Sequence, residues 1–360
     1  MQLAAGRARP GADIGGQHPS TLAFLYPKHW EREPSHDWQD IVPQLASWIE
    51  ARKLLPTESI ASTLDALDLN AFVRLVFPYC SSFRHLLWIG KYTVWLYLAD
   101  DELEMLTALG RHDDASAKVA EYSAQLGARS ESQEVLARTL GELSEELRAI
   151  AVDRSKHRKW EKSHLRYWYD GVLMEGRQDA GQVAACLKRK PAVTAVHVYF
   201  DLIELMAGVT LPTSMEACPE LHRLRDLGAL IDGLYNDVLS YERDKVVPSH
   251  SNIALSLRES CRDEQQNLAL VAACHNELVR LFDALADVMS QRHLHRTNEL
   301  AGYVQHMRYQ LAGLARWQLQ AKRYEGRFST RIVTYATERR PARIAKSNLW
   351  RLSIQRLLLQ

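Results

Sequence analysis

The sequence predicts an all-α protein built as a single domain, and three observations lead to this prediction. Apolar residues recur at intervals of three and four residues in most parts of the chain, which is typical of helices with one buried face. Neither sustained apolar–polar alternation nor an Asn-Gly or Asp-Gly hairpin turn between β-branched runs is found. No internal repeat or inter-domain linker divides the 360 residues, and 46% hydrophobic residues are enough for one large core.

Taken in order along the chain, the periodic segments give the expected helices. In the first segment, Ile41, Leu45, Trp48 and Ile49 lie at helical spacing. The segments with such spacing are 37–52, 92–105, 132–148, 231–245, 267–290 and 300–320. Residues that interrupt helices fall between them, and these are Pro56, Pro78, Gly110, Pro191, Pro212, Pro219 and Pro248.

The two ends of the chain differ from this pattern. Residues 1–20 are rich in Gly, Ala and Pro without an apolar core, so we expect a flexible N-terminal tail and no secretory signal. The helical domain is expected over 21–330. Residues 331–360 form a basic segment, for which a solvated tail or terminal helix and a surface for an anionic partner are the alternative interpretations.

Composition excludes several classes of partner. The formal net charge is +1 with 25% charged residues, so no long-range field suits nucleic acid. The five cysteines are scattered without a C-x-x-C pair, which favours reduced thiols in the cytoplasm over disulfides or a zinc site. Since no charge-free apolar run is long enough to cross a bilayer, we expect no stable membrane anchor.

An acidic cluster follows an unusually apolar helical run. Asp100, Asp101 and Glu104 come directly after the sequence YTVWLYLA, and on a helix Asp100 and Glu104 share a face. A solvent-facing acidic turn is the alternative interpretation. However, carboxylates at the end of a buried helix repel one another unless a cation neutralises them, and hard divalent ions such as Mg²⁺ take oxygen ligands of this kind.

A second polar stripe lies near the middle of the chain. Asn236, Ser240 and Asp244 recur every four residues after another mostly apolar segment. An amide, a hydroxyl and a carboxylate are all hard oxygen donors, so the stripe is a candidate metal site, with a wet helix face as the alternative.

Together the two clusters resemble the metal motifs of microbial class I terpene synthases, DDxx(D/E) and (N/D)DxxSxxx(E/D). The block NDVLSYERD departs from that pattern where Asp244 replaces the usual Glu. The resemblance implies a class I terpenoid synthase bundle around a central apolar cavity. It implies three Mg²⁺ ions and the ionisation and cyclisation of an isoprenyl diphosphate, with farnesyl diphosphate favoured and geranylgeranyl diphosphate next. A homodimer is a candidate assembly.

The same resemblance assigns residues to the diphosphate. Arg243, Arg323 and Tyr324 stand where the family has diphosphate donors. The spacing of the family's diphosphate sensor lands on Lys190, with Arg189 one residue earlier, and we favour Arg189 because a guanidinium can bind phosphate with two parallel hydrogen bonds. Asp101 is expected to hold the metal-binding side chains in position rather than to contact the metal as directly as Asp100 does.

Aromatic residues are expected to line the cavity, because their faces stabilise carbocations without reacting. For each of them an ordinary core position is the competing interpretation. The expected wall residues are Tyr92, Leu96, Tyr97 and Trp317, with Phe77 and Phe200 as weaker candidates. The resemblance also implies a glycine at a helix break beside the cavity, called the effector glycine in this family, and here Thr194 or Val193 stands in its place.

Two other functions are compatible with these motifs. A chain-elongating prenyltransferase shares the helical architecture but has two DDxxD motifs, whereas the second motif here is NDxxSxxxD. A catalytically inactive diphosphate-binding relative is the second alternative, because of Asp244 and the altered sensor region.

Overall fold

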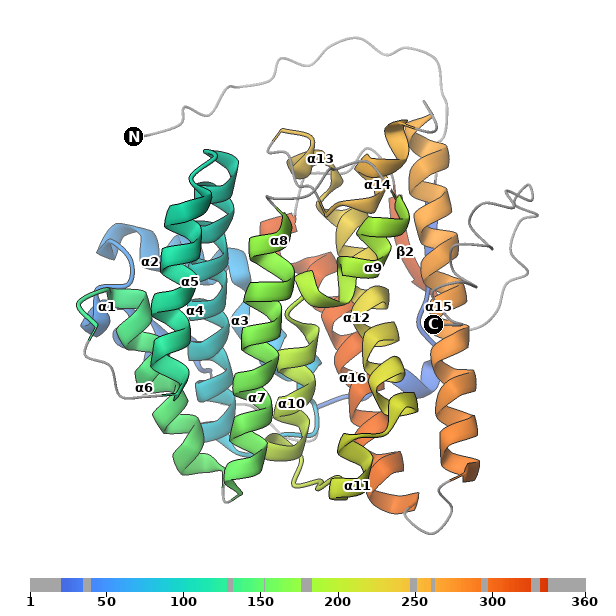
Figure 1. Cartoon of the computed structure of the whole chain (residues 1–360), viewed down its shortest axis with the longest axis horizontal. Coiled ribbons are helices and arrows are strands. Elements are labelled where there is room, and N and C mark those ends of the chain that lie inside the picture. The colour runs from blue at the N-terminus through green and yellow to red at the C-terminus, as the bar shows by residue number, and fades with distance from the viewer. Residues whose placement is uncertain are drawn as a thin grey trace.

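The computed structural model describes residues 21–34, 40–127, 132–151, 153–175, 183–246, 251–259, 263–292, 297–324 and 331–335. The helical prediction is confirmed in these residues (Figure 1). The predicted tail over 1–20 lies outside them, as does most of the basic C-terminal segment.

The α-helices are α1 (Val42–Arg52), α2 (Thr57–Leu67), α3 (Leu69–Val76), α4 (Phe83–Ala108), α5 (His112–Gly127), α6 (Val135–Ile150), α7 (Arg154–Arg166), α8 (Leu173–Glu175), α9 (Val183–Val193), α10 (Val196–Met206), α11 (Thr213–Glu216), α12 (Pro219–Leu239), α13 (Tyr241–Asp244), α14 (Ile253–Ser256), α15 (Glu264–Arg292) and α16 (Thr297–Gln320). Short 3-10 turns are η1 (Lys28–Trp30), η3 (Leu257–Glu259) and η5 (Lys322–Tyr324), and η2 (Tyr167–Val172) is a π-helical turn that continues α7.

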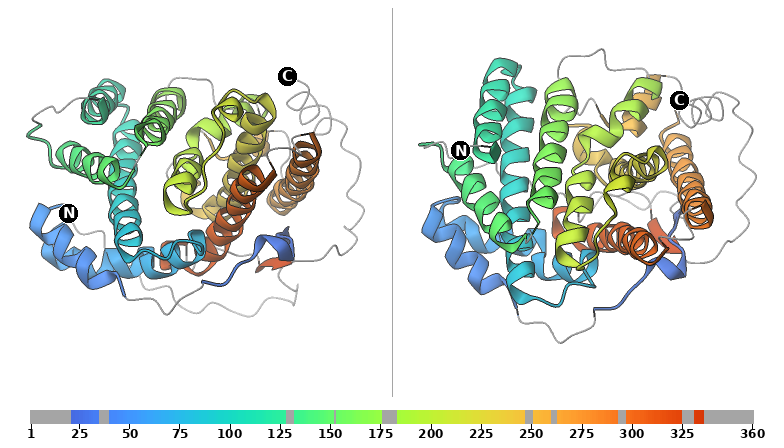
Figure 2. Two further views of the ribbon diagram at one scale, coloured as in Figure 1. Left: turned by 90° about the horizontal axis from the view of Figure 1, so that it is seen from below. Right: turned by 60° about the horizontal axis from the view of Figure 1, so that its bottom comes forward.

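The long helices run roughly along one direction and pack side by side (Figures 1 and 2). In α4 buried residues occupy every face over its first half, so this helix lies inside the bundle, as its apolar sequence predicts. Trp88 and Trp95 fix it to α6, because their indole N–H groups donate to the carbonyls of Leu143 at 3.0 Å and Leu136 at 2.8 Å.

Close packing of α16 on α3 depends on a glycine. A Cβ atom at Gly313 would come within 2.0 Å of the Leu75 carbonyl oxygen, so only glycine fits there. This contact places the C-terminal half of α16 beside α3 and α4. The indole of Trp317, one turn later on α16, then donates to the carbonyl of Leu67 at 2.7 Å.

A two-stranded parallel sheet is the element that the sequence did not predict. Strand β1 (Thr21–Leu25) pairs with β2 (Arg331–Tyr335), in the register Thr21 to Arg331 and Leu25 to Tyr335. The sheet is held to α15 by Asn276, whose amide donates to Ala23 and accepts from the Leu25 N–H. Both strands are only five residues long, too short for alternation to be noticed in the sequence.

The predicted helices at 37–52, 132–148, 267–290 and 300–320 correspond to α1, α6, α15 and α16. The interruption expected at Pro191 is wrong, because α9 continues through Pro191 to Val193. Proline removes one backbone donor, and the helix ends only two residues later. Pro56, Pro212 and Pro219 do begin helices, and Gly110 has the positive φ of 71° expected for a helix end.

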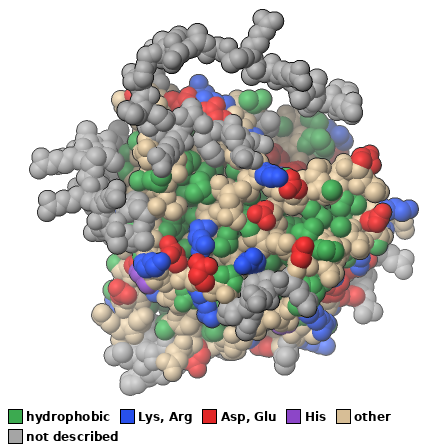
Figure 3. All heavy atoms as spheres, turned by 180° about the vertical axis from the view of Figure 1, so that it is seen from behind, with side chains coloured by type: hydrophobic (Ala, Val, Ile, Leu, Met, Phe, Trp, Pro, Cys, Tyr) green, Lys and Arg blue, Asp and Glu red, His purple; other side chains and the backbone are tan. Residues whose placement is uncertain are grey.

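The surface carries both signs of charge. On the face drawn in Figure 3, Lys and Arg side chains alternate with Asp and Glu side chains. Within the described part of the chain, none of the helices combines the length and the apolarity needed to cross a bilayer.

Candidate active site

A cavity of about 240 Å³ opens at the end of the bundle where α4, α12 and α13 terminate. Asp100, Glu104, Arg243 and Asp244 line the part near these helix ends, which we call the mouth, and aromatic, apolar and further polar side chains line the rest. Thirteen of the residues singled out in the sequence line it, namely Leu96, Tyr97, Asp100, Glu104, Lys190, Val193, Thr194, Asn236, Arg243, Asp244, Trp317, Arg323 and Tyr324.

The α4 wall contributes two of its three acidic residues. Asp100 and Glu104 line the cavity, whereas Asp101 turns outward and forms an ion pair with Arg323, with the shorter contact at 2.7 Å. Tyr167 on η2 donates from its hydroxyl to Asp100 Oδ1 at 2.5 Å. The helical spacing therefore places Asp100 and Glu104 at the cavity and Asp101 beside a basic residue of the site.

The facing wall is built from the second stripe. Asn236 lines the cavity, and its amide nitrogen donates to the Tyr324 hydroxyl at 3.2 Å, which leaves Oδ1 without a hydrogen-bond partner among the described residues. Asp244 lines the cavity as well. Ser240 is buried behind it and donates to Asp244 Oδ2 at 2.7 Å. The helix bends at Ser240, but the backbone bonds from Ser240 to Asn236 and from Asp244 to Ser240 keep the stripe on one face.

Arg243 connects the two acidic walls. Its Nε donates to Asp244 Oδ1 at 2.9 Å, and its Nη2 lies 3.7 Å from Glu104 Oε1. One guanidinium can reach both carboxylates only if α4 and α13 end beside each other. The two oxygen-rich motifs therefore share one site.

Burial leaves the carboxylates at this mouth poorly stabilised as anions. Desolvation raises the pKa of Asp100, against the hydrogen bond from Tyr167, which lowers it. Desolvation also raises the pKa of Glu104, against the charge of Arg243. Among the described residues, no three His, Cys, Asp or Glu side chains converge closely enough to hold a metal ion by themselves. A metal here would need amide, hydroxyl or ligand oxygens in addition.

Lys190, rather than Arg189, is the basic residue at the cavity. Lys190 is buried, forms an ion pair with Asp237 and donates to the Ser251 carbonyl at 3.1 Å. The Lys190 side chain crosses α12 at Gly233, and a Cβ atom at position 233 would come within 2.8 Å of Lys190 Cε. Arg189 does not line the cavity, because α9 turns consecutive side chains about 100° apart and only one of the two can face inward. The geometry therefore favours Lys190, and the role of either residue as diphosphate sensor stays a prediction.

Asp237 is a residue of this site that the motif reading passed over. Its Oδ2 accepts from the Ile253 N–H at 3.0 Å, and its Oδ1 faces Lys190. Burial raises its pKa to about 6, while Lys190 opposes this shift. Asp237 thus ties α12 to α9 and to the start of α14.

Asn252 is a second residue that the sequence analysis missed, and it holds Asp244, the residue that stands in place of the family's usual Glu. Its side-chain amide donates to Asp244 Oδ2 and to the Asp237 carbonyl, both at 2.9 Å, and its Oδ1 accepts from Leu255 N–H at the start of α14. Only 1% of Asn252 is exposed. No signal in the sequence marks this asparagine, because its partners lie eight and fifteen residues earlier in the chain.

The aromatic wall is partly as expected. Tyr97 and Trp317 line the cavity with their rings 6.1 Å apart, and Leu96 lies beside them. The guanidinium of Arg323 lies 4.6 Å from the Tyr97 ring centre. Thr194 lines the cavity too, and its buried hydroxyl has no hydrogen-bond partner among the described residues.

Three predicted wall residues belong to the core instead. Tyr92 donates to or accepts from His164 at 2.8 Å within a cluster of tryptophans. Phe200 packs against the backbone at Gly228, and Phe77 is fully buried. Periodicity identifies a buried side chain but not whether its neighbour is a cavity or another side chain. Phe72 and Tyr199 line the cavity and were missed for the same reason.

Known proteins match this chain over most of its length. Residues 91–281 match the sequence profile described as terpene synthase family 2, C-terminal metal binding. A (+)-eremophilene synthase of Sorangium cellulosum is 22% identical over 81% of this chain and 89% of its own. A (2Z,6E)-hedycaryol synthase of Kitasatospora setae is 25% identical over 77% of this chain and 85% of its own.

Solved structures share the fold. The structure of 2-methylisoborneol synthase from Streptomyces coelicolor A3(2), in complex with Mg²⁺ and 2-fluoroneryl diphosphate, superposes with a TM-score of 0.69 at 15% identity, covering 84% of this chain and 97% of that one. Wild-type cucumene synthase gives a TM-score of 0.67 at 21% identity, over 80% and 97% of the two chains.

Proposed function

Because this chain belongs to the terpene synthase family and is a class I terpene cyclase, we propose that it ionises farnesyl diphosphate in the cavity between α4 and α12. The observation that carries the assignment to this cavity is the Arg243 bridge. One guanidinium contacts Asp244 and Glu104, so both motifs border the mouth of a single cavity.

The family's metal-binding domain implies a divalent metal cofactor, and the residues at the mouth fit one. The Asn236 amide oxygen has no hydrogen-bond partner in the described part of the chain, and buried carboxylates beside it lack full neutralisation. We propose that Asp100, Glu104, Asn236, Ser240 and Asp244 hold three Mg²⁺ ions together with the diphosphate. Bound Mg²⁺ supplies positive charge that stabilises the departing diphosphate.

The basic side chains of the mouth would bind the same leaving group. In the absence of ligand Arg243 is paired with carboxylates of the site and Arg323 with Asp101. When the substrate binds, we propose that both guanidinium groups turn to the diphosphate oxygens, with Lys190 and the Tyr324 hydroxyl as further donors. Preorganised donors at this position stabilise the charge that develops as the carbon–oxygen bond breaks.

The deeper cavity would receive the carbocation. Tyr97 and Trp317 present aromatic rings, and each ring would stabilise a nearby cation by roughly 0.5 to 2 kcal/mol. The apolar side chains of the wall keep water away from the carbocation until the isoprenyl chain of the substrate has cyclised.

Farnesyl diphosphate is the favoured substrate because two relatives that align over most of this chain are sesquiterpene synthases. The (+)-eremophilene and hedycaryol synthases both align over more than three quarters of this chain. Geranylgeranyl diphosphate is the next candidate.

The test is incubation of the purified chain with farnesyl, geranyl and geranylgeranyl diphosphate, with Mg²⁺ and with EDTA, followed by gas chromatography–mass spectrometry. We expect a cyclic sesquiterpene only from farnesyl diphosphate with Mg²⁺. Release of diphosphate without cyclic product would contradict the cyclase proposal. Consumption of added isopentenyl diphosphate would instead indicate chain elongation.

A further inference from the structure

One acidic residue lies inside the cavity rather than at its mouth. Asp232 lines the cavity wall and precedes Asn236 by one helical turn of α12, so it lies about 6 Å deeper along the helix axis. Its neighbours Ile231 and Gly233 are buried, whereas Asp232 keeps accessible surface, which therefore belongs to the cavity wall.

The partners of Asp232 distinguish it from most acids of the site. Its Oδ1 accepts a hydrogen bond of 2.9 Å from the neutral amide of Gln318 on α16. Among the described residues no cation forms an ion pair with it and Oδ2 accepts no hydrogen bond. Asp237, Asp244 and Glu104, by contrast, each have a lysine or arginine within ion-pair distance, and only Asp100 at the mouth likewise has a neutral donor in place of a cation, the Tyr167 hydroxyl.

A carboxyl group in this environment accepts protons readily. Burial raises the pKa of Asp232 to about 7, although the hydrogen bond from Gln318 and the charge of Lys190 lower it. The group is thus divided between its charged and neutral forms near neutral pH. A proton acceptor is most effective when its pKa lies near the working pH.

A purely structural role does not account for a carboxylate at this position. An asparagine would offer Gln318 the same acceptor without the cost of desolvating a charge. The carboxyl group faces the space into which, under the proposed function, the carbocation moves. A lone carboxylate there has one chemical ability that an amide lacks, which is to take up a proton.

Resting on the function proposed above, we infer that Asp232 is a catalytic residue that takes the final proton from the cyclised carbocation. A C–H bond next to the cationic carbon breaks, and its electron pair forms a C=C double bond. The proton passes to Asp232 Oδ2, which gives a neutral acid and a neutral olefin. The acid returns the proton to solvent after the product leaves.

The experiment compares Asp232→Asn with wild type, and it measures diphosphate release and the product mixture separately. We expect diphosphate release within about threefold of wild type, because ionisation takes place at the mouth. The yield of the main wild-type olefin should fall at least about tenfold, with other olefin isomers or alcohols in its place. An unchanged product mixture would overturn the inference.

Two further variants make the result specific. Asp232→Glu keeps a carboxyl group and should restore part of the wild-type product, whereas a merely structural role would make the longer side chain the more disruptive of the two. Asp226→Asn, on the same helix but outside the cavity lining, should leave the mixture unchanged. If wild type itself released no diphosphate from farnesyl diphosphate, the proposed function would fail, whatever Asp232 does.

Discussion

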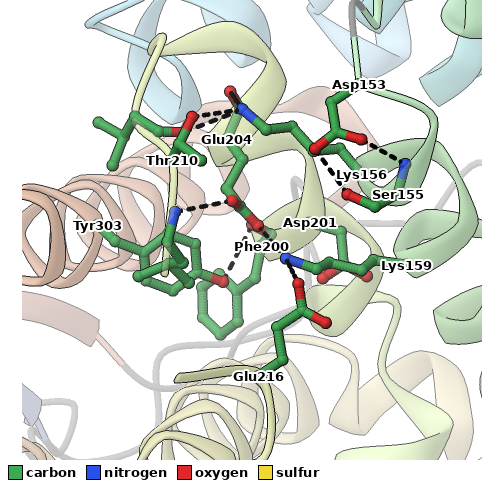
Figure 4. Close-up of polar contacts among 12 residues, drawn as sticks. Asp153, Ser155, Lys156, Lys159, Phe200, Asp201, Glu204, Thr210, Glu216 and Tyr303 are labelled. Carbon is green, nitrogen blue, oxygen red and sulfur yellow. Dashed lines mark hydrogen bonds and ion pairs between the residues drawn. The ribbon is translucent and has the colours of Figure 1, made fainter. Parts of the chain in front are cut away.

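Buried carboxylates occur near both ends of the helical bundle, and they are neutralised in different ways. Near the end that carries α11, Glu204 accepts from Lys159 Nζ and from the Leu211 N–H, both at 2.9 Å (Figure 4). In the same cluster Asp201 accepts from Arg225 at 2.7 Å and from Ser163. All four carboxylate oxygens have a donor, so this cluster is complete without any ligand.

At the opposite end, beside α13, Asp237 and Asp244 have donors to both oxygens, but the two cavity-lining acids of α4 are incompletely paired. Asp100 has the Tyr167 hydroxyl, and Glu104 has a guanidinium at 3.7 Å. Burial raises the pKa of both. The difference teaches that buried charge alone does not identify a functional site: a saturated cluster stabilises the fold, whereas an unsaturated one indicates a missing partner.

The largest effect is expected from Asn236→Ala. This change removes an amide oxygen that the described fold does not use and one 3.2 Å hydrogen bond to Tyr324, so the far-ultraviolet circular dichroism should stay as in wild type and the melting temperature should change little. Turnover of farnesyl diphosphate should fall more than about a hundredfold, because a proposed metal ligand is lost. Wild-type turnover would show that the unsaturated end is not the metal site.

The opposite result is expected from Glu204→Ala in the saturated cluster. It leaves Leu211 N–H without its acceptor and Lys159 without one of two carboxylates, and breaking a buried pair costs about 3 to 5 kcal/mol of the free energy of unfolding. Chemical denaturation measures this loss. As a matched control, Glu204→Gln keeps an acceptor oxygen and should lose less, and both variants should retain kcat while folded.

A smaller loss is expected from Asn252→Ala, which sharpens the comparison at the Asp244 position. Asp244 would keep the bonds from Ser240 to Oδ2 and from Arg243 to Oδ1 but lose the second donor to Oδ2. Turnover should fall about tenfold to a hundredfold, with a higher Mg²⁺ concentration needed for half-maximal rate. An unchanged Mg²⁺ dependence would mean that Asn252 only caps α14.

The pH dependence of stability should differ between wild type and Asp232→Asn. The folded-state pKa of Asp232 is raised to about 7, above the unfolded value, so the stability that its neutral form provides is lost as pH rises from about 4 through about 7. The variant should therefore melt increasingly higher than wild type between pH 5 and pH 8. A constant difference in melting temperature across this range would contradict the assignment.

The smallest effect is expected from Arg189→Gln. Because Arg189 does not line the cavity, the turnover of farnesyl diphosphate by this variant should stay within about twofold of wild type. Lys190→Gln at the neighbouring position removes the partner of buried Asp237 and should reduce both turnover and stability. Equal effects of the two changes would restore Arg189 as a candidate diphosphate donor.

Spacing along the sequence was enough to predict the helices and the two metal motifs. Asp100 with Glu104, and Asn236 with Asp244, share helix faces because residues four positions apart lie one above the other, and this periodicity is local. The resemblance to class I terpene synthases, rather than periodicity, pointed to Arg243, Arg323 and Tyr324, which the fold brings to the same cavity.

Only the tertiary structure decided what those faces meet. It placed Lys190 rather than Arg189 at the cavity, and it brought Asn252 into contact with Asp244. It also placed Tyr92, Phe77 and Phe200 in the core rather than at the cavity. It also revealed that Asp232 faces the cavity while its helix neighbours are buried. Helical spacing determines the direction of a side chain relative to its own helix axis, but whether that direction leads to a cavity, a counter-charge or another side chain depends on helices distant in the sequence.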